Sequence, residues 1–136
     1  MSPTSRSAAR VLVIDDDPVI RSLLRKLLEL AKTPYEIREA VDAASARRTL
    51  ESDRFDCIVL DHLLPDMSGL DFLKWLRTKD HHTPVVVFTG MGDEALAVDM
   101  MKAGATDYLS KVGFVKERFL EAVRHASESR KATAHV

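Results

Sequence analysis

Five short apolar stretches recur along the chain, and each is followed by a segment with helical spacing. Three of them, VLVI, CIVL and VVVF, are continuously apolar, which is typical of parallel strands covered on both faces. A fourth, YEIREA, alternates apolar and polar residues, as an edge strand does. We therefore predict strands at Val11–Asp15, Tyr35–Ala40, Asp56–Asp61, Pro84–Thr89 and Thr106–Leu109.

Apolar residues spaced three and four apart predict a helix after every strand. For the first helix, Asp17 can act as N-cap, and Pro18 suits the first position because no backbone donor is needed there. Ser68 and Asp71 have the spacing of a capping box for the third helix. The other predicted helices are Asp42–Glu51, a segment between Asp93 and Gly104, and Phe114–Ser129.

This order is a strand and a helix repeated five times. Short strand–helix–strand units require parallel strands with right-handed crossovers, so we predict an α/β fold, a three-layer doubly wound sandwich. In such folds functional sites lie outside the carboxyl ends of the strands. Residues 1–9 are predicted to be disordered, residues 10–128 to form the domain, and residues 129–136 to be a frayed tail.

Composition narrows the classes further. The 136 residues carry a formal net charge of −1, so no overall basic field favours nucleic acid. The single cysteine, Cys57, excludes an intramolecular disulfide and suits the cytoplasm. No segment approaches the roughly 20 apolar residues of a membrane span, and the first apolar run is too short for a signal peptide.

Polar side chains collect where the predicted strands end. The first strand runs into three consecutive aspartates, and a helix cap explains only the third of them. Carboxylates gathered at one edge suit a hard cation, so we predict a Mg²⁺ site, with Mn²⁺ also compatible. A metal, a carboxylate, a hydroxyl and an ammonium together suit phosphoryl transfer. The residues at this edge are Asp15, Asp16, Asp17, Asp61, Thr89 and Lys111.

At this point the chain resembles a response-regulator receiver domain of two-component signalling over about residues 10 to 128. The matching residues are the pair Asp15-Asp16 after VLVI, Asp61 in CIVLDHLLPDMSGL, Thr89 in PVVVFTG and Lys111 in GATDYLSK. Each motif alone is weak, but all four in this order are specific. The resemblance implies a flavodoxin-like (βα)5 fold with five parallel strands in the order 2-1-3-4-5.

The resemblance also implies roles for the matching positions. Asp61 would accept the phosphoryl group, while Asp15, Asp16, Asp61 and the backbone carbonyl of Leu63 would hold the metal ion. Thr89 and Lys111 would contact the phosphoryl oxygens. Tyr108, three residues before the lysine, would turn inward on activation; a strand-edge aromatic residue would also account for it.

The mechanism that the resemblance implies is a two-state change. Phosphorylation draws Thr89 toward the phosphoryl group, Tyr108 fills the vacated space, and the face of the fourth helix, fifth strand and fifth helix changes. The donor would be a phosphohistidine on a sensor histidine kinase or a histidine phosphotransfer protein, and the output an unknown downstream protein. We expect no direct nucleic-acid or membrane binding and no turnover of an external substrate. Dimerisation through the changed face stays open.

Three further residues are expected to lie beside the site: two with apolar side chains and one histidine. The resemblance implies that the side chains of Leu63 and Met91 flank the phosphoryl group; because both are apolar, we expect them to exclude water and slow hydrolysis, although loop packing explains them equally well. His62 follows Asp61 directly. We expect it to be a partly exposed rim residue, because alternation along a strand points neighbours to opposite sides.

Two further features concern the loop after Lys111 and the first helix. The resemblance implies a proline after the lysine, but this chain has Val112, so we predict a trans bond with Gly113 easing the turn. The first helix has more apolar surface than a core stripe needs, which predicts either tighter core cover or a docking strip for a partner's helices. The residues of this strip are Val19, Ile20, Leu23, Val112 and Phe114.

Two other functions stay open. VLVIDDDPV also fits the opening motif of haloacid-dehalogenase-like phosphatases, with Asp15 as nucleophile, Asp17 as acid/base, and Thr89 and Lys111 in supporting roles. That function leaves Asp61 unexplained and lacks a later aspartate motif. A binding module that is never phosphorylated is the third candidate. The sequence ends soon after the fifth helix, so we expect a receiver without an output domain here, whether complete or a piece of a larger regulator or hybrid kinase.

Overall fold

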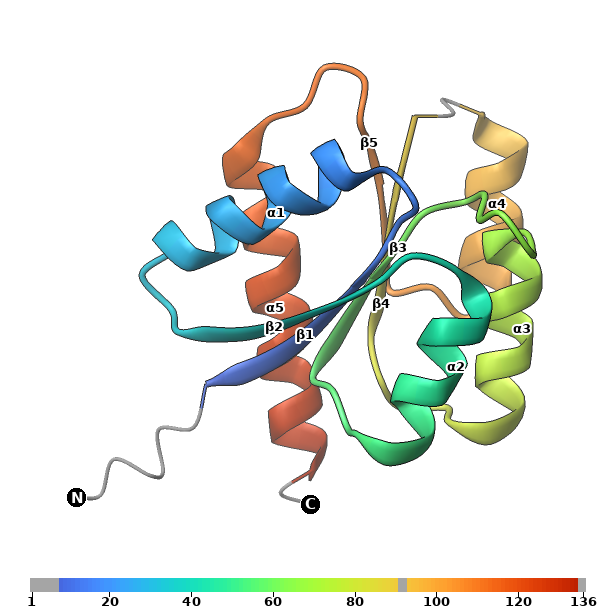
Figure 1. Ribbon diagram of the computed structural model, residues 1–136, viewed down its shortest axis with the longest axis horizontal. Helices are drawn as coiled ribbons and strands as arrows, with labels where there is room; N and C mark the ends of the chain where they lie inside the picture. Colours follow the sequence, from blue (N-terminus) through green and yellow to red (C-terminus); the bar gives the residue numbers. More distant parts are fainter. Residues whose placement is uncertain (1–7, 91–92, 135–136) are drawn as a thin grey trace.

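A five-stranded parallel sheet forms the centre of the molecule (Figure 1). The computed structural model describes residues 8–90 and 93–134. Strand order is β2-β1-β3-β4-β5, which confirms the predicted doubly wound fold. The elements are β1 (Ala9–Ile14), α1 (Pro18–Leu30), β2 (Tyr35–Ala40), α2 (Ala43–Ser52), β3 (Cys57–Leu60), α3 (Gly69–Lys79), β4 (Val85–Thr89), α4 (Glu94–Lys102), β5 (Asp107–Ser110) and α5 (Lys116–Ala134).

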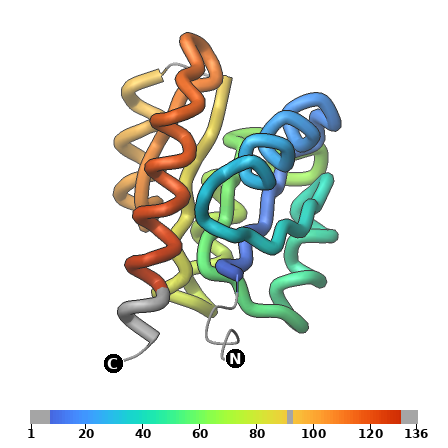
Figure 2. The backbone as a smooth tube through the Cα atoms, turned by 90° about the vertical axis from the view of Figure 1, so that its left-hand side faces the viewer, coloured from blue at the N-terminus to red at the C-terminus, as the bar shows by residue number. Residues whose placement is uncertain are grey.

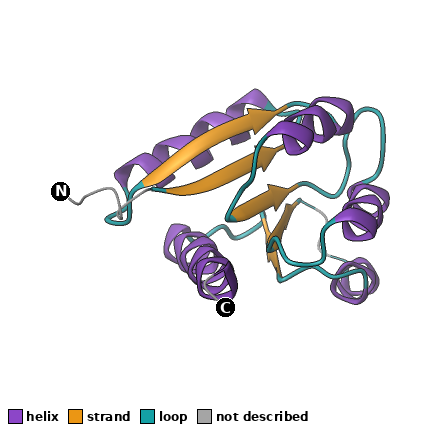
Figure 3. Ribbon diagram, turned by 90° about the horizontal axis from the view of Figure 1, so that it is seen from below, coloured by secondary structure: helices purple, strands orange, loops and turns teal. Residues whose placement is uncertain are grey.

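The helices cover the sheet unequally: α1 and α5 pack on one face, and α2, α3 and α4 on the other (Figures 1 and 3). Alternation along β1 supplies both cores. Val11 and Val13 point to the side of α1 and α5, whereas Leu12 and Ile14 point to the side of α2 and α3. All four are fully buried, which explains why this strand reads as a continuous apolar run.

Both ends of the described chain extend further than predicted. β1 begins at Ala9, which pairs with Tyr35, so Ala9 belongs to the sheet and not to the N-terminal segment. The fifth helix begins at Lys116 and continues to Ala134, past the predicted end at Ser129. Its last residues include alanine, lysine and arginine, which are good helix formers, and no glycine or proline interrupts them. Figure 2 shows α5 running along the height of the molecule.

A different start for the fifth helix follows from the turn after β5. Gly113 has φ of +69°, a conformation that glycine adopts without strain. Phe114, predicted to be helical, instead lies between this turn and α5, and its ring centroid is 5.5 Å from that of Phe88. The described residues contain no cis peptide bond, so the Lys111–Val112 bond is trans, as predicted.

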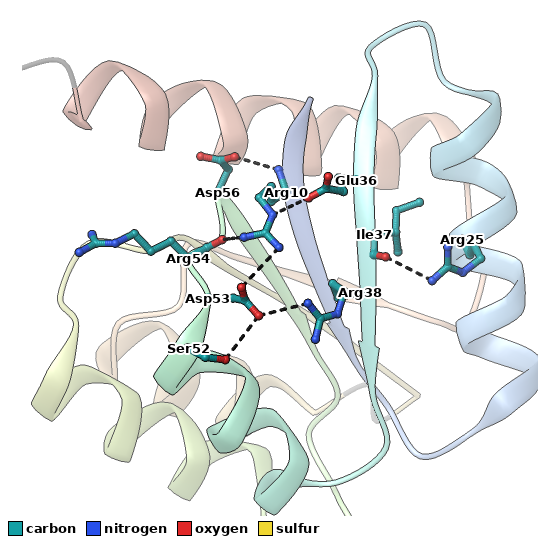
Figure 4. Close-up of polar contacts among 9 residues, drawn as sticks. All are labelled: Arg10, Arg25, Glu36, Ile37, Arg38, Ser52, Asp53, Arg54 and Asp56. Atoms are coloured by element: carbon teal, nitrogen blue, oxygen red, sulfur yellow. Dashed lines mark hydrogen bonds and ion pairs between the residues drawn. The ribbon is translucent and has the colours of Figure 1, made fainter. Parts of the chain in front are cut away.

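Charged side chains tie the amino ends of the strands together (Figure 4). Arg10 on β1 donates to Glu36 on β2 and to the Arg54 carbonyl, and its backbone amide donates to Asp56 just before β3. Asp53 accepts from Arg38 on β2 at 3.1 Å. This cluster lies at the edge opposite the predicted site. Among the described residues, no helix combines the length and the apolar character that crossing a membrane requires.

Candidate functional site

Three charged residues from three strand ends meet at the carboxyl edge of the sheet. Lys111 Nζ lies 2.9 Å from Asp15 Oδ2 and 3.4 Å from Asp61 Oδ2. Asp15 is 2% exposed and Asp61 8% exposed, so two carboxylates and one ammonium share a nearly buried space. The residues follow β1, β3 and β5, which lie far apart in the sequence. The parallel topology brings them together, as the sequence predicts.

Backbone amides fix the free oxygen of each buried carboxylate. The Asp17 amide donates to Asp15 Oδ1 at 2.9 Å, and the His62 amide donates to Asp61 Oδ1 at 2.8 Å. Asp17 itself caps α1, its side chain accepting from the Val19 amide, as predicted. Each buried carboxylate therefore presents one fixed oxygen to the backbone and directs the other toward Lys111.

The acidic residues fit a divalent metal ion. Asp15, Asp16 and Asp61 each offer a carboxylate oxygen, and these oxygens lie within 4.8 Å of one another. Asp16 is exposed, whereas the other two are buried, so the cluster opens toward solvent on one side. All donors are hard oxygens, the ligands that Mg²⁺ prefers. The arrangement suits a cation held by one or two carboxylates together with water or phosphate oxygens.

Burial and charge shift two pKa values in this cluster. Burial raises the pKa of Asp15 above its ordinary value, although hydrogen bonds from Lys111 and the Asp17 amide oppose this, and the charge of Asp61 adds to it. For Lys111, burial alone would lower the pKa, but the hydrogen bond and charge of Asp15, and the charge of Asp61, raise it. Three carboxylates and one ammonium meet at this edge, so a cationic ligand would relieve the excess of negative charge.

Thr89 lies at the end of β4, fully buried, beside these charges. Its hydroxyl is hydrogen-bonded to His62 Nδ1, and the same nitrogen lies 3.3 Å from Asp61 Oδ1. His62 is partly exposed, as expected, but its ring points into the site and not away from it. Sequence reasoning missed this because β3 ends at Leu60, and strand alternation does not extend to a residue two positions beyond.

The loop after Asp61 is built around a close approach of Gly69. A Cβ atom at Gly69 would lie 2.2 Å from the Asp61 carbonyl oxygen and 2.9 Å from His62 Cα. The Gly69 amide donates to the His62 carbonyl at 2.6 Å. Asp66, in the same loop, accepts from the amides of Ala43 and Ala44 in the first turn of α2. The LPDMSG segment therefore positions Asp61 and ties the site to α2.

The remaining predicted site residues fall into three groups. Tyr108 on β5 is half-buried against the core, and burial, with the nearby charge of Asp93, raises its pKa. Leu63 is exposed beside the site, whereas Met91 lies outside the described residues. Of the predicted docking strip, Val19, Leu23 and Val112 are exposed. Ile20 and Phe114 are partly buried and pack on the core formed with α5.

Comparison with known proteins matches this geometry to one family. The family model described as "Response regulator receiver domain" matches residues 11–124. The chain is 35% identical over 121 residues to the response regulator protein PilR of Pseudomonas aeruginosa, covering 87% of the chain. It is 37% identical over 133 residues to the C4-dicarboxylate transport transcriptional regulatory protein DctD of the same organism, covering 96% of the chain.

Solved structures agree with the sequence relatives. A CheY-like response regulator receiver domain protein from Methanospirillum hungatei superimposes with a TM-score of 0.84 at 25% identity. The match covers 93% of this chain and 99% of that one. By contrast, the chain spans only 27% of PilR and 28% of DctD, which are longer proteins.

Proposed function

The chain belongs to the response-regulator receiver family of two-component systems, and we propose that Asp61 accepts a phosphoryl group from a phosphohistidine. The donor would be a sensor histidine kinase or a histidine phosphotransfer protein. An Asp61 carboxylate oxygen attacks phosphorus, the P–N bond of the donor breaks, and the imidazole leaves with the bond's electron pair. The product is an acyl phosphate on Asp61, and the chain is not a turnover enzyme on an external substrate.

The observation that carries this proposal is the position of Asp61: its Oδ2 lies 3.4 Å from Lys111 Nζ, and its Oδ1 lies 3.3 Å from His62 Nδ1, to which the Thr89 hydroxyl is hydrogen-bonded. Asp61 can therefore present an oxygen to an incoming phosphoryl group while Lys111 and Thr89 stand ready to contact the phosphoryl oxygens. Electrostatic stabilisation of this kind is the main contribution a protein makes to phosphoryl transfer.

A Mg²⁺ ion would complete the charge balance. Asp15, Asp16, Asp61 and the backbone carbonyl of Leu63 would hold it, with Mn²⁺ as a substitute. When bound, it supplies positive charge to the phosphoryl oxygens. The chain's own residues do the rest: Asp15 holds Lys111 at the site, and the amide of His62 orients the Asp61 carboxylate.

Signal output would come from the face formed by α4, β5 and α5. Thr89 ends β4, and Tyr108 lies on β5, the strand that pairs with β4. A movement of the Thr89 hydroxyl toward Asp61 would therefore change the packing beside β5 first. Tyr108 would fill the vacated space. A downstream protein, or a second copy of the chain, would recognise the changed face. The exposed residues Val19, Leu23 and Val112 would contact the helices of the phosphodonor.

The test is incubation with acetyl phosphate and Mg²⁺ followed by intact-mass measurement. We expect wild type to gain one phosphoryl group, a chelator to abolish the gain, and Asp61→Asn to show none. Should Asp61→Asn still hydrolyse phosphate esters while Asp15→Asn does not, the chain would act as a haloacid-dehalogenase-like phosphatase. Absence of both modification and hydrolysis would indicate a binding module.

In the same assay, Leu63→Asn should lose its phosphoryl group faster than wild type if Leu63 shields it from water.

A further inference from the structure

The contact between His62 and Thr89 assigns a role to a residue next to the phosphoacceptor. We propose that His62 is a positioning residue that holds the Thr89 hydroxyl in the unphosphorylated protein, so that the phosphoryl group must displace it. This inference rests on the proposed function, because the competitor for the hydroxyl is the phosphoryl group on Asp61. His62 would then determine how much free energy is needed to move the Thr89 hydroxyl from its position in the unphosphorylated protein to the phosphoryl group.

The first step is that the hydroxyl has to choose between partners. Thr89 is fully buried, so water does not readily replace a lost hydrogen bond there. In the resting protein the hydroxyl is hydrogen-bonded to His62 Nδ1. To bind a phosphoryl oxygen on Asp61, it has to leave that nitrogen. The affinity for the phosphoryl group is therefore reduced by whatever the His62 contact contributes.

The second step is that the backbone of His62 is held in place while the hydroxyl changes partner. The backbone of His62 is fixed on both sides: its amide donates to Asp61 Oδ1 at 2.8 Å, and its carbonyl accepts from the Gly69 amide at 2.6 Å. Gly69 also lies so close to His62 Cα that no Cβ fits between them. The His62 backbone therefore does not move with a Thr89 hydroxyl that turns to the phosphoryl group, and the ring could follow only by rotating about its side-chain bonds.

Because His62 Nδ1 stabilises the resting position of the Thr89 hydroxyl, losing it shifts the equilibrium toward the phosphoryl-bound arrangement. This competition requires the His62 tautomer in which Nδ1 accepts from the Thr89 hydroxyl, because a phosphoryl oxygen also has to accept that single proton. Loss of one competing hydrogen bond of ordinary strength corresponds to a change of about two- to tenfold in an equilibrium constant.

Two variants of nearly equal shape separate this role from general packing. His62→Asn can present an amide oxygen where Nδ1 lies, so it retains a partner for Thr89. His62→Leu has the same branched outline without polar atoms. If His62 only fills space, the two variants should bind the phosphoryl mimic with similar affinity. If His62 holds the Thr89 hydroxyl, His62→Asn should bind the mimic like wild type and His62→Leu should differ. Urea unfolding of both verifies that they are folded before binding is compared.

The experiment is a titration with beryllofluoride and Mg²⁺, an acyl-phosphate mimic, followed by amide NMR of Thr89 and Tyr108. We expect His62→Leu to bind about two- to tenfold more tightly than wild type, and His62→Asn to stay within about twofold of it. Unchanged or weaker binding by His62→Leu overturns the proposal, because His62 would then be neutral or a direct phosphoryl ligand. An Asn variant that matches Leu overturns it as well.

A second measurement tests the resting contact without any phosphoryl mimic. Nitrogen-15 NMR of the histidine rings is compared between wild type and Thr89→Val, which removes the hydroxyl at nearly constant volume. The His62 Nδ1 resonance should move; if it does not, His62 does not hold the Thr89 hydroxyl. If the His62 resonance moves but wild type neither binds beryllofluoride nor accepts a phosphoryl group, the proposed function of Asp61 is refuted, and with it the competition for the Thr89 hydroxyl. If wild type binds beryllofluoride and His62→Leu binds it equally well, only the positioning role of His62 is refuted.

Discussion

Replacing Lys111 with methionine tests whether the site is held together by charge. The change removes an ammonium that lies 2.9 Å from Asp15 Oδ2 and 3.4 Å from Asp61 Oδ2, and leaves a side chain of similar length. Both carboxylates then face each other without a cation in a nearly buried space. We expect the folded state to be destabilised because carboxylate repulsion is no longer offset.

The magnitude follows from the exposure of the pair. A hydrogen bond to a charged group contributes about 1.5–3 kcal/mol, and removing one partner of a fully buried ion pair costs about 3–5 kcal/mol. The Lys111 side chain is 19% exposed, so water screens part of the interaction. We therefore expect a loss of about 2–3 kcal/mol in the free energy of unfolding, a large part of the roughly 5–15 kcal/mol of a typical domain.

The pH range of this effect follows from the direction of the Lys111 shift. Its pKa in the folded protein is raised above the ordinary value of 10.5, so its contribution is fully present below pH 10.5. The contribution disappears as the pH rises through the folded-state pKa. Near neutral pH the full difference between wild type and Lys111→Met should therefore be measurable.

Urea unfolding at pH 7, with EDTA and then with excess Mg²⁺, is the assay. The deficit of Lys111→Met should shrink in Mg²⁺, because a divalent cation neutralises the same carboxylates that the ammonium does. Lys26→Met, at an exposed position on α1, is the matched control and should stay within about 0.5 kcal/mol of wild type. A deficit that is equal with and without Mg²⁺ would refute the electrostatic reasoning and indicate lost packing.

Three further changes probe the surroundings of the site. Gly69→Ala places a Cβ 2.2 Å from the Asp61 carbonyl oxygen and should cost about 1–3 kcal/mol in urea unfolding. The control is Gly90→Ala, whose Cβ would meet no atom of the described residues within 4 Å, and it should leave the midpoint nearly unchanged. Asp61→Asn should lower the pKa of Asp15, measured by carboxyl NMR titration. Because the folded-state pKa of Asp15 is raised, the folded protein loses stability as the pH rises through that pKa, and in Asp61→Asn this loss should be smaller. An Asp15 titration that is unchanged in Asp61→Asn would contradict the charge interaction between the two carboxylates. Asp66→Ala removes two acceptors from the first turn of α2 and should cost about 1 kcal/mol, with equal midpoints arguing that water replaces the cap.

The fold and most of the site could be predicted because both depend on simple periodicities. Continuous apolar runs require strands buried on both faces, and parallel strands place all their carboxyl ends at one edge. That reasoning alone gathers Asp15, Asp61, Thr89 and Lys111, which the structure brings together. Capping by Asp17 was also predictable, because a cap depends only on neighbouring residues.

The features that could not be predicted depend on how the backbone turns in the loops after the strands. His62 lies two residues after β3 ends, where the backbone turns and strand alternation no longer gives the direction of a side chain. Phe114 was assigned to a helix, but the positive φ of Gly113 makes a turn that sends its ring into the core beside Phe88. In both cases the backbone conformation of the few residues after a strand decides where the side chain lies.

The two edges of the sheet use charge differently, and this bears on how a ligand acts. At the amino edge, Arg10 and Glu36 form an ion pair whose side chains are 30% and 60% exposed, so it contributes at most about 1 kcal/mol. At the carboxyl edge, Asp15 and Asp61 are nearly buried, and Lys111 is the one lysine or arginine, in the part of the chain that the structure describes, whose side chain lies within 4 Å of their carboxylates. The amino-edge pairs are too weak to offset that cost, so the apolar cores on both faces of the sheet must do so. Relief of charge at the carboxyl edge, by a cation or by changing Asp61, should therefore stabilise the whole domain, whereas breaking the exposed Arg10–Glu36 pair with Glu36→Gln should change the free energy of unfolding little.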